Sequence, residues 1–197
     1  YDRRMARICN SLAGNGFEVM LLGRELKVSI PLVKKKYAQK RIKCFFKKGK
    51  LFYVEYNIRV FIFLLFKRFD IIGSVDTDTL LAGYLASKIK NKKLVFDAHE
   101  YFTEVPEVVN RPFVKNTWKF LEKCIIPEIK NGYTVSDSLS VLFKKNYGVD
   151  FKVIKNVPLL FDFYEPEKKE IYILYQGAAN VGRGLEEMIH AMQYINC

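Results

Sequence analysis

The sequence predicts an α/β fold in which a parallel sheet is flanked by helices. Short apolar segments alternate along the chain with segments of about ten or more residues that carry helical periodicity. This alternation is typical of βαβ units, in which crossover helices join parallel strands. With 197 residues, of which 50% are hydrophobic and 15% aromatic, the chain is long enough for one packed domain and part of a second.

The first half of the chain is predicted to contain two helices and three strands. Residues 2–13 carry apolar side chains at helical spacing, and Asn15-Gly16 ends that helix. Residues 51–69 are apolar nearly all round, so this helix is expected to be buried, with a position on a membrane surface as the alternative. Apolar runs predict strands at residues 17–23, near 42–46 and at 70–75.

The second half repeats the alternation, and its helices carry start signals. Thr77 or Asp78 is expected to cap a helix over residues 78–90, and a helix over residues 112–130 is expected to bend at Pro127. The remaining predicted elements are strands at residues 93–97, 132–136, 151–155 and 171–176, a helix from Ser136 or Asp137 to Tyr147, and a helix over residues 184–195.

Two domains joined by a linker are expected. Residues 156–169 contain two prolines and no periodicity, which is typical of a linker. Residues 1–155 are therefore assigned to a first domain, and residues 170–197 to the truncated start of a second one. Because an α/β domain normally begins on a central strand, a first strand and a glycine-rich turn are expected ahead of Tyr1.

The net charge of +12 is concentrated in one part of the chain. Residues 24–50 carry eleven Lys or Arg against the single Glu25, a local charge of +10. Such a patch attracts an anionic lipid surface, a phosphorylated acceptor or nucleic acid, although a solvated face explains it as well. Nucleic acid is the least expected partner, because no nucleic-acid-binding motif accompanies the charge. The residues assigned to this membrane or polyanion patch are Lys34, Lys35, Lys36, Lys40, Arg41, Lys43, Lys47 and Lys48.

Three absences bear on location. No stretch reaches the roughly 18 uninterrupted apolar residues of a membrane-spanning helix. The chain also opens without the apolar run of a signal peptide. The four cysteines show no CxxC spacing and predict free thiols rather than a zinc site. The expected location is cytoplasmic, and peripheral at the inner face of the plasma membrane if the basic patch binds lipid.

His99 and Glu100 follow the strand predicted at residues 93–97. In an open α/β sheet, ligands bind at the carboxyl ends of the parallel strands, so these two residues are the candidate catalytic groups. His99 can donate a hydrogen bond or act as an acid or base, and Glu100 can act as a base or a counter-charge. The alternative for His99 is a structural histidine.

A second candidate site follows the strand predicted at residues 171–176. Gly177 allows close approach of the backbone to a ligand, and Arg183-Gly184 opens the next helix. The N–H groups at a helix N-terminus attract phosphate, and an arginine can hold two phosphate oxygens at once. Glycine-rich turns also occur without any ligand, so phosphate binding is one of two interpretations here.

Two other motifs are assigned to structure. Asp76-Thr77-Asp78 has the Asp-x-Asp spacing that holds a divalent metal in some enzymes, but a helix cap explains Thr77 and Asp78 better. His190, in the middle of the last predicted helix, is expected to be structural. No metal site and no resident cofactor are expected.

Five short segments carry a resemblance that covers nearly the whole chain. They are Asp2-Arg3-Arg4 with the helix and strand that follow, Phe69-Asp70-Ile71-Ile72, Val95-Phe96-Asp97-Ala98-His99-Glu100, Val153-Ile154-Lys155-Asn156, and Leu174-Tyr175-Gln176-Gly177 with Arg183-Gly184. In this order they resemble the retaining glycosyltransferases of family 4, whose fold is called GT-B.

The resemblance implies two Rossmann-like domains facing each other across a cleft, with the acceptor on the N-terminal domain and the nucleotide-sugar donor on the other. It implies sugar transfer with retention of configuration and without a metal, to a lipid-linked or saccharide acceptor in surface polysaccharide biosynthesis. His99 would approach the donor sugar, and Arg183 would neutralise the diphosphate leaving group. Gly177 and Gly184 would complete the donor-phosphate site. The residues that would line the acceptor side are Tyr1, Asp2, Arg3, Glu100 and Tyr101.

Two departures from the family pattern leave other functions open. Ala178 stands where the family more often has an arginine, and the paired glutamates that hold the donor in this family would lie beyond Cys197. This stretch by itself is therefore expected to be inactive. The alternatives are a non-catalytic binding module of the same fold and a sugar-nucleotide epimerase.

Overall fold

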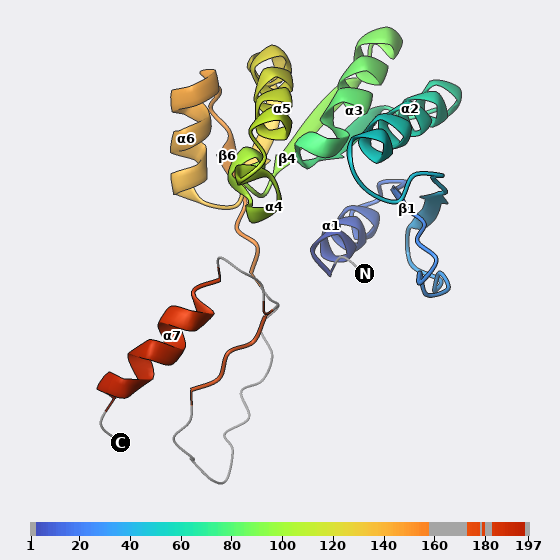
Figure 1. The fold of residues 1–197 in the computed structure, drawn as a ribbon. Helices are drawn as coiled ribbons and strands as arrows, with labels where there is room; N and C mark the ends of the chain where they lie inside the picture. Colours follow the sequence, from blue (N-terminus) through green and yellow to red (C-terminus); the bar gives the residue numbers. More distant parts are fainter. Residues whose placement is uncertain (1–2, 158–172, 178, 180–182, 196–197) are drawn as a thin grey trace.

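A computed structural model describes residues 3–157, 173–177, 179 and 183–195 (Figure 1). The predicted α/β fold, with parallel strands flanked by helices, is confirmed. The strands are β1 (Met20–Arg24), β2 (Ala38–Ile42), β3 (Ile71–Val75), β4 (Lys93–Ala98), β5 (Asn131–Thr134) and β6 (Lys152–Val153). Four of them form one parallel sheet in the order β3-β4-β5-β6, and β1 and β2 form a separate parallel pair.

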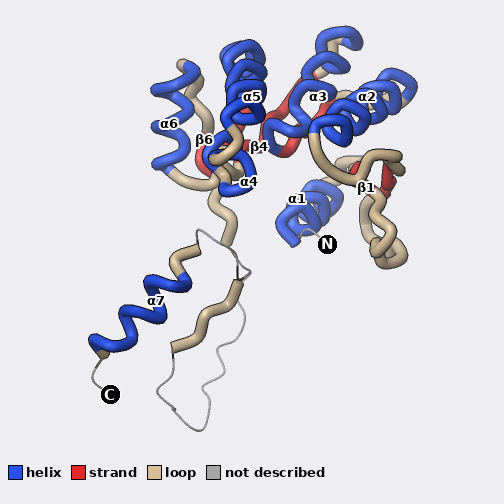
Figure 2. Tube along the Cα trace, in the orientation of Figure 1, coloured by secondary structure: helices blue, strands red, loops and turns tan. Residues whose placement is uncertain are grey.

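Helices lie on both faces of the four-stranded sheet (Figures 1 and 2). On one face are α3 (Asp76–Lys90), α5 (Pro112–Ile125) and α6 (Asp137–Tyr147), with α2 (Lys50–Phe66) beside α3; α1 (Arg3–Gly14) lies on the other. Because successive side chains of a strand point to opposite faces, Phe96 of β4 faces α3 and α6 whereas Asp97 faces α1. The short elements are η1 (Phe102–Glu104), α4 (Pro106–Val109), η2 (Ile126–Glu128), α7 (Leu185–Ala191) and η3 (Met192–Tyr194).

The main core lies between the four-stranded sheet and helices α3, α5 and α6. Phe96 and Leu80 are fully buried there, and the ring of Phe151 meets Phe96 edge-on with 5.9 Å between centroids. Gly132 of β5 leaves the space that Phe151 fills, since a Cβ at Gly132 would lie 2.4 Å from that ring. Burial of these large side chains supplies much of the driving force for folding.

A second core joins the two sheets through α2. Phe52 and Val60 of α2 pack with Ala82 of α3, and β1 and β2 contribute Leu22 and Ile42 to the same cluster. No pairing between described strands links β1 to β3, so α2 holds the β1-β2 pair beside the larger sheet.

Two strands differ most from their predicted bounds, while β1 and β5 are shifted by one to three residues. The strand predicted near residues 42–46 is β2, which ends at Ile42. The N–H groups of Phe45 and Phe46 bond the Glu55 carboxylate of α2 instead of a neighbouring strand, which explains the earlier end. The strand predicted over residues 151–155 is the two-residue β6.

The helix predicted over residues 112–130 ends at Ile125 and continues as the 3₁₀ turn η2. Pro127 lies in that turn and has no N–H with which to continue an α-helix, so the predicted bend is an end. Of the two residues predicted to cap α6, Ser136 and Asp137, it is Ser136 that does so, since its Oγ accepts from the N–H of Leu139 at 3.3 Å.

The cap predicted for α3 is wrong. The helix already begins at Asp76, and its N-cap residue, Val75, makes no side-chain hydrogen bond. Thr77 and Asp78 therefore lie inside the first turn. The Thr77 hydroxyl donates to Glu122 of α5, so it stabilises a contact between helices rather than a helix end.

The C-terminal predictions fall partly outside the described residues. Residues 173–176 are described and form no strand, so the strand predicted over 171–176 is absent from this part. The helix predicted over residues 184–195 is α7 followed by η3. His190 of α7, predicted to be structural, is exposed. Most of the linker predicted at residues 156–169 lies outside the described residues.

Candidate functional site

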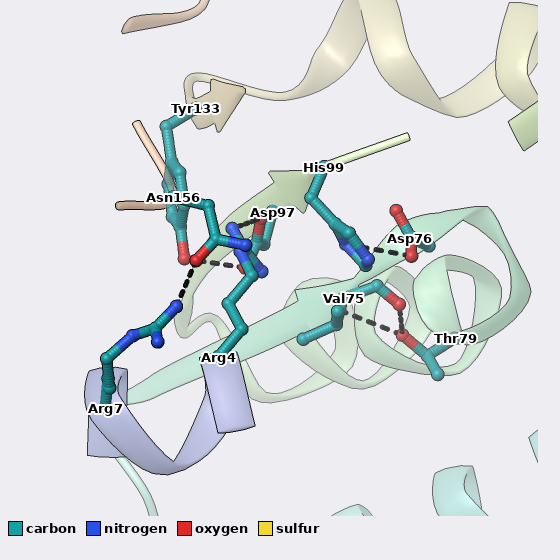
Figure 3. A network of polar contacts seen from close by, with 9 residues as sticks. All are labelled: Arg4, Arg7, Val75, Asp76, Thr79, Asp97, His99, Tyr133 and Asn156. Atoms are coloured by element: carbon teal, nitrogen blue, oxygen red, sulfur yellow. Dashed lines mark hydrogen bonds and ion pairs between the residues drawn. The ribbon is translucent and has the colours of Figure 1, made fainter. Parts of the chain in front are cut away.

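Polar side chains gather at the edge of the sheet where β3, β4 and β5 end (Figure 3). Asp76 follows β3, Asp97 and His99 lie at the end of β4, and Tyr133 lies beside Asp97 in β5. The carboxyl ends of parallel strands are where open α/β sheets bind ligands. This edge is therefore the candidate site.

The first component of the site is a buried ion pair between Arg4 and Asp97. Nη1 and Nη2 of Arg4 donate to the two carboxylate oxygens of Asp97 at 2.6 Å each, a bidentate arrangement. Arg4 is 9% exposed and Asp97 3%, so both charges are shielded from water. The pair ties the first turn of α1 to the end of β4.

Two further contacts complete this part of the site. The Tyr133 hydroxyl donates to Asp97 Oδ2 at 2.8 Å, and burial together with that hydrogen bond raises the pKa of Tyr133. Arg7, one turn along α1 from Arg4, donates to Oδ1 of Asn156 after β6. α1 is thus held to both the centre and the end of the sheet by arginines.

The second component is a partly exposed pair of His99 and Asp76. His99 Nδ1 lies 3.0 Å from Asp76 Oδ2, with the two side chains 26% and 13% exposed. The contact has the distance of an ion pair but not the angles of a hydrogen bond, and Asp76 Oδ1 is buried without a hydrogen-bond partner. The contact with Asp76 raises the pKa of His99, which favours the imidazolium. Unsatisfied polar atoms in a half-open position are typical of a place that binds a further polar group.

The backbone at Asp76 is in an unusual conformation. Its φ of 54° lies in the left-handed region, which is uncommon for a residue other than glycine. Such a conformation persists where the surroundings hold it, and it is frequent at functional sites. Here Thr79 Oγ1 donates to the Val75 carbonyl at 2.8 Å and accepts from the Val75 N–H at 3.0 Å, which holds the turn around Asp76.

The buried carboxylate of Glu122 contacts the first turn of α3. Glu122 of α5 is 2% exposed and accepts from the Thr77 hydroxyl at 2.7 Å and from the Tyr147 hydroxyl at 2.5 Å. Burial raises the pKa of Glu122. These bonds join α3, α5 and α6, and they fix the turn that carries Asp76 and Asp78.

Asp78 is expected to make the folding stability depend on pH. Burial, and then the nearby Asp76 carboxylate, raises the pKa of Asp78 from 3.8 to about 7. An acidic side chain whose pKa is higher in the folded chain than in the unfolded chain makes its full contribution to folding stability only at pH values below its unfolded pKa. That contribution to stability is therefore lost as the pH rises from about 4 through about 7.

Replacing Asp78 with asparagine is expected to raise the free energy of unfolding at about pH 8 by about 1–2 kcal/mol, because the side chain at this position then carries no charge. The decline in stability between about pH 4 and pH 7 should flatten, as measured by urea unfolding at a series of pH values. Asp137→Asn, an exposed first-turn position of α6, is the matched control and should change the pH dependence little. The same decline in Asp78→Asn as in the parent chain would contradict the assignment.

The predicted acceptor-side residues are spread along this edge. Residues 1–2 lie outside the described residues, and Arg3 is exposed at the start of α1. Tyr101 is half-buried, packs edge-on against a phenylalanine of α6, and accepts a hydrogen bond from Nδ2 of Asn146 at 2.7 Å. Glu100 is exposed next to His99.

The predicted donor-phosphate residues are not brought to His99. Gly177 and Arg183 are exposed, and Gly184, at a φ of 68°, is the N-cap of α7. α7 lies apart from the sheet in Figure 1, and none of its residues is buried. Residues 178 and 180–182 of this loop lie outside the described residues.

The predicted basic patch is mostly exposed. Lys43 lies 3.6 Å from Glu25, and the half-buried Arg41 donates to the Ile30 carbonyl at 2.6 Å. The exposed members are Lys34, Lys35, Lys36, Lys40, Lys43, Lys47 and Lys48.

The sequence interpretation misses four site residues: it assigns Asp76 to structure and does not single out Tyr133, Arg4 or Asp97 as members of the site. It treats Asp97 as the end of a strand and Arg4 as part of a motif. One signal was present, because Arg4 shares a helix face with Ile8, one turn further on. A cation on an apolar helix face usually has a buried partner, since charged residues are rarely buried unless paired.

Within the described residues, no three His, Cys, Asp or Glu side chains are grouped so that they could hold a metal ion. No helix in the described part of the chain is both long and apolar enough to cross a membrane. No protein-family model matches the chain, and the comparison with curated proteins finds no match.

Proposed function

We propose that this chain forms the acceptor-side part of a retaining, metal-independent glycosyltransferase with the GT-B fold. The reaction would move a sugar from a nucleotide-sugar to a lipid-linked or saccharide acceptor. The observation that carries the proposal is the partly exposed pair of His99 and Asp76 at the carboxyl ends of two neighbouring strands. The α/β architecture with its parallel sheet supports the same proposal.

The pair of His99 and Asp76 has the chemistry that such a transfer needs. Asp76 lies at Nδ1 and favours the protonated imidazole, in which Nε2–H is a donor toward a bound ligand. That N–H can hydrogen-bond a sugar hydroxyl and stabilise negative charge that grows as the nucleoside diphosphate departs. His99 is therefore the proposed catalytic residue, and Asp76 positions it.

The pair of Arg4 and Asp97 has a different role in the proposal. Its charges neutralise each other and are nearly inaccessible, so neither group is available to a substrate. Its contribution is to fix α1 across the ends of the strands. The exposed members of the basic patch supply the attraction for a phosphorylated lipid acceptor instead.

Arg183→Ala, made in the polypeptide encoded by the whole gene, tests the donor half of the proposal. Loss of one charge-assisted hydrogen bond to the diphosphate should lower turnover about 10- to 100-fold. The assay follows release of nucleoside diphosphate over a panel of nucleotide-sugars. Arg111→Ala, an exposed arginine before α5, is the matched control and should leave turnover unchanged.

The same assay separates the rival functions. Equal turnover of the Arg183 and Arg111 variants would show that Arg183 does not bind the phosphate. If no donor is consumed with any acceptor, the chain is a binding module rather than an enzyme. A changed nucleotide-sugar in the absence of acceptor would identify an epimerase.

A further inference from the structure

The outward face of α2 is an uninterrupted apolar stripe. After Lys50 at its start, every exposed residue of α2 is apolar, and the five recur every three or four positions along one side of the helix. Their exposed fractions are 58, 56, 52, 48 and 85% in chain order. We call this set the α2 stripe: Leu51, Val54, Ile58, Ile62 and Phe66.

Polar side chains of α2 beside the stripe are bound by neighbouring groups. Glu55 accepts from two backbone N–H groups of the preceding loop and pairs with Arg59 at 2.7 Å. Asn57 donates to the Asp78 carbonyl at 2.8 Å and accepts a backbone N–H of α3 at 3.2 Å. The helix thus has one apolar face in the core and a second one toward solvent, with its polar groups bound between them.

Cations lie at both ends of the α2 stripe. Lys47, Lys48 and Lys50 precede it, and Lys67 and Arg68 follow it, all of them exposed. No acidic residue belongs to the stripe. An apolar stripe with basic ends matches a surface that offers acyl chains and negative headgroups together.

We propose that the α2 stripe docks onto an anionic lipid bilayer, with the helix lying flat in the interface. The stripe spans 16 residues, or about 24 Å of helix, which suits a flat position and is too short to cross the bilayer. A second copy of the chain fits this face poorly, because each copy carries a net charge of +12 and the two would repel each other. The inference stands independently of sugar transfer.

Co-sedimentation with vesicles tests the proposal without donor or acceptor. The chain is expected to bind vesicles of phosphatidylcholine with phosphatidylglycerol, and to bind phosphatidylcholine alone far more weakly. Ile58→Asp with Ile62→Asp should weaken binding at least about 10-fold, since two isoleucines then no longer enter the bilayer. Both positions are about half exposed in the folded chain, so urea unfolding should show that the double variant still folds.

The matched control is Val141→Asp with Ile154→Asp, which changes the charge equally at positions that are 64% and 55% exposed away from α2. This variant should bind vesicles nearly as well as the parent chain. Equal loss in the two double variants would overturn the proposal, because charge alone would then explain binding. Dimers that form without lipid and are lost only in the stripe variant would identify a second copy as the occupant instead.

Discussion

Replacing Asp97 with alanine is expected to lower the free energy of unfolding by about 3–5 kcal/mol, because removing one partner leaves a buried charge uncompensated. Arg4 would remain 9% exposed with no carboxylate to receive its two 2.6 Å hydrogen bonds. The Tyr133 hydroxyl would lose its acceptor as well. Urea unfolding followed by circular dichroism measures the change.

Two controls separate the buried pair from charge removal in general. Glu128→Ala breaks the ion pair between Glu128 and Lys88. In that pair the Lys88 side chain is 56% exposed and the Glu128 side chain 52%. An exposed pair of this kind contributes about 0–1 kcal/mol, so this variant should be close to the parent chain. Tyr133→Phe should cost about 1 kcal/mol, the net value of one hydrogen bond. If Asp97→Ala lowers the free energy of unfolding by less than Tyr133→Phe does, the pair of Arg4 and Asp97 does not hold α1 to the sheet.

The second large effect is expected at His99. In the polypeptide encoded by the whole gene, His99→Ala should lower turnover about 10²- to 10⁴-fold, the usual contribution of a positioned acid or base. The other histidine of the chain, His190, is exposed on α7 and serves as the matched control. If His190→Ala and His99→Ala have equal activity, the proposed catalytic role is wrong.

Asp76→Asn distinguishes positioning from a merely structural role. Asp76 raises the pKa of His99, so removing its charge should lower the pKa of the imidazole. Activity that depends on the imidazolium is lost as the pH rises through that pKa, and this loss should therefore occur at lower pH in the variant. A fall in activity with an unchanged pH profile would assign Asp76 to structure alone.

Much of the fold follows from local patterns in the sequence. The alternation of apolar runs and helical periodicity predicts the parallel sheet and its helices, because each period reports which side chains must be buried. Ser136 caps α6 as predicted, since the cap needs only an N–H three residues away. His99 lies at the predicted strand end for the same reason.

The boundaries that differ from prediction depend on partners far along the chain. Thr77 is a good cap by type, yet its hydroxyl meets Glu122, 45 residues later. β2 stops at Ile42 because Glu55 of α2 takes the next two N–H groups. Uniform apolarity predicts burial of α2, but the helix buries one face and exposes the other, since only one side of it packs against α3 and the β1-β2 pair.

By itself the sequence determined the α/β class, most of the helices and the presence of His99 at a strand end, all of which depend on neighbours within one turn or one strand. The tertiary structure alone decided the composition of the site. Arg4 and Asp97 are 93 residues apart, and the pairing of His99 with Asp76 requires β3 and β4 to lie side by side. Such pairs leave almost no local signal, because the burial that makes them strong arises only when distant segments pack together.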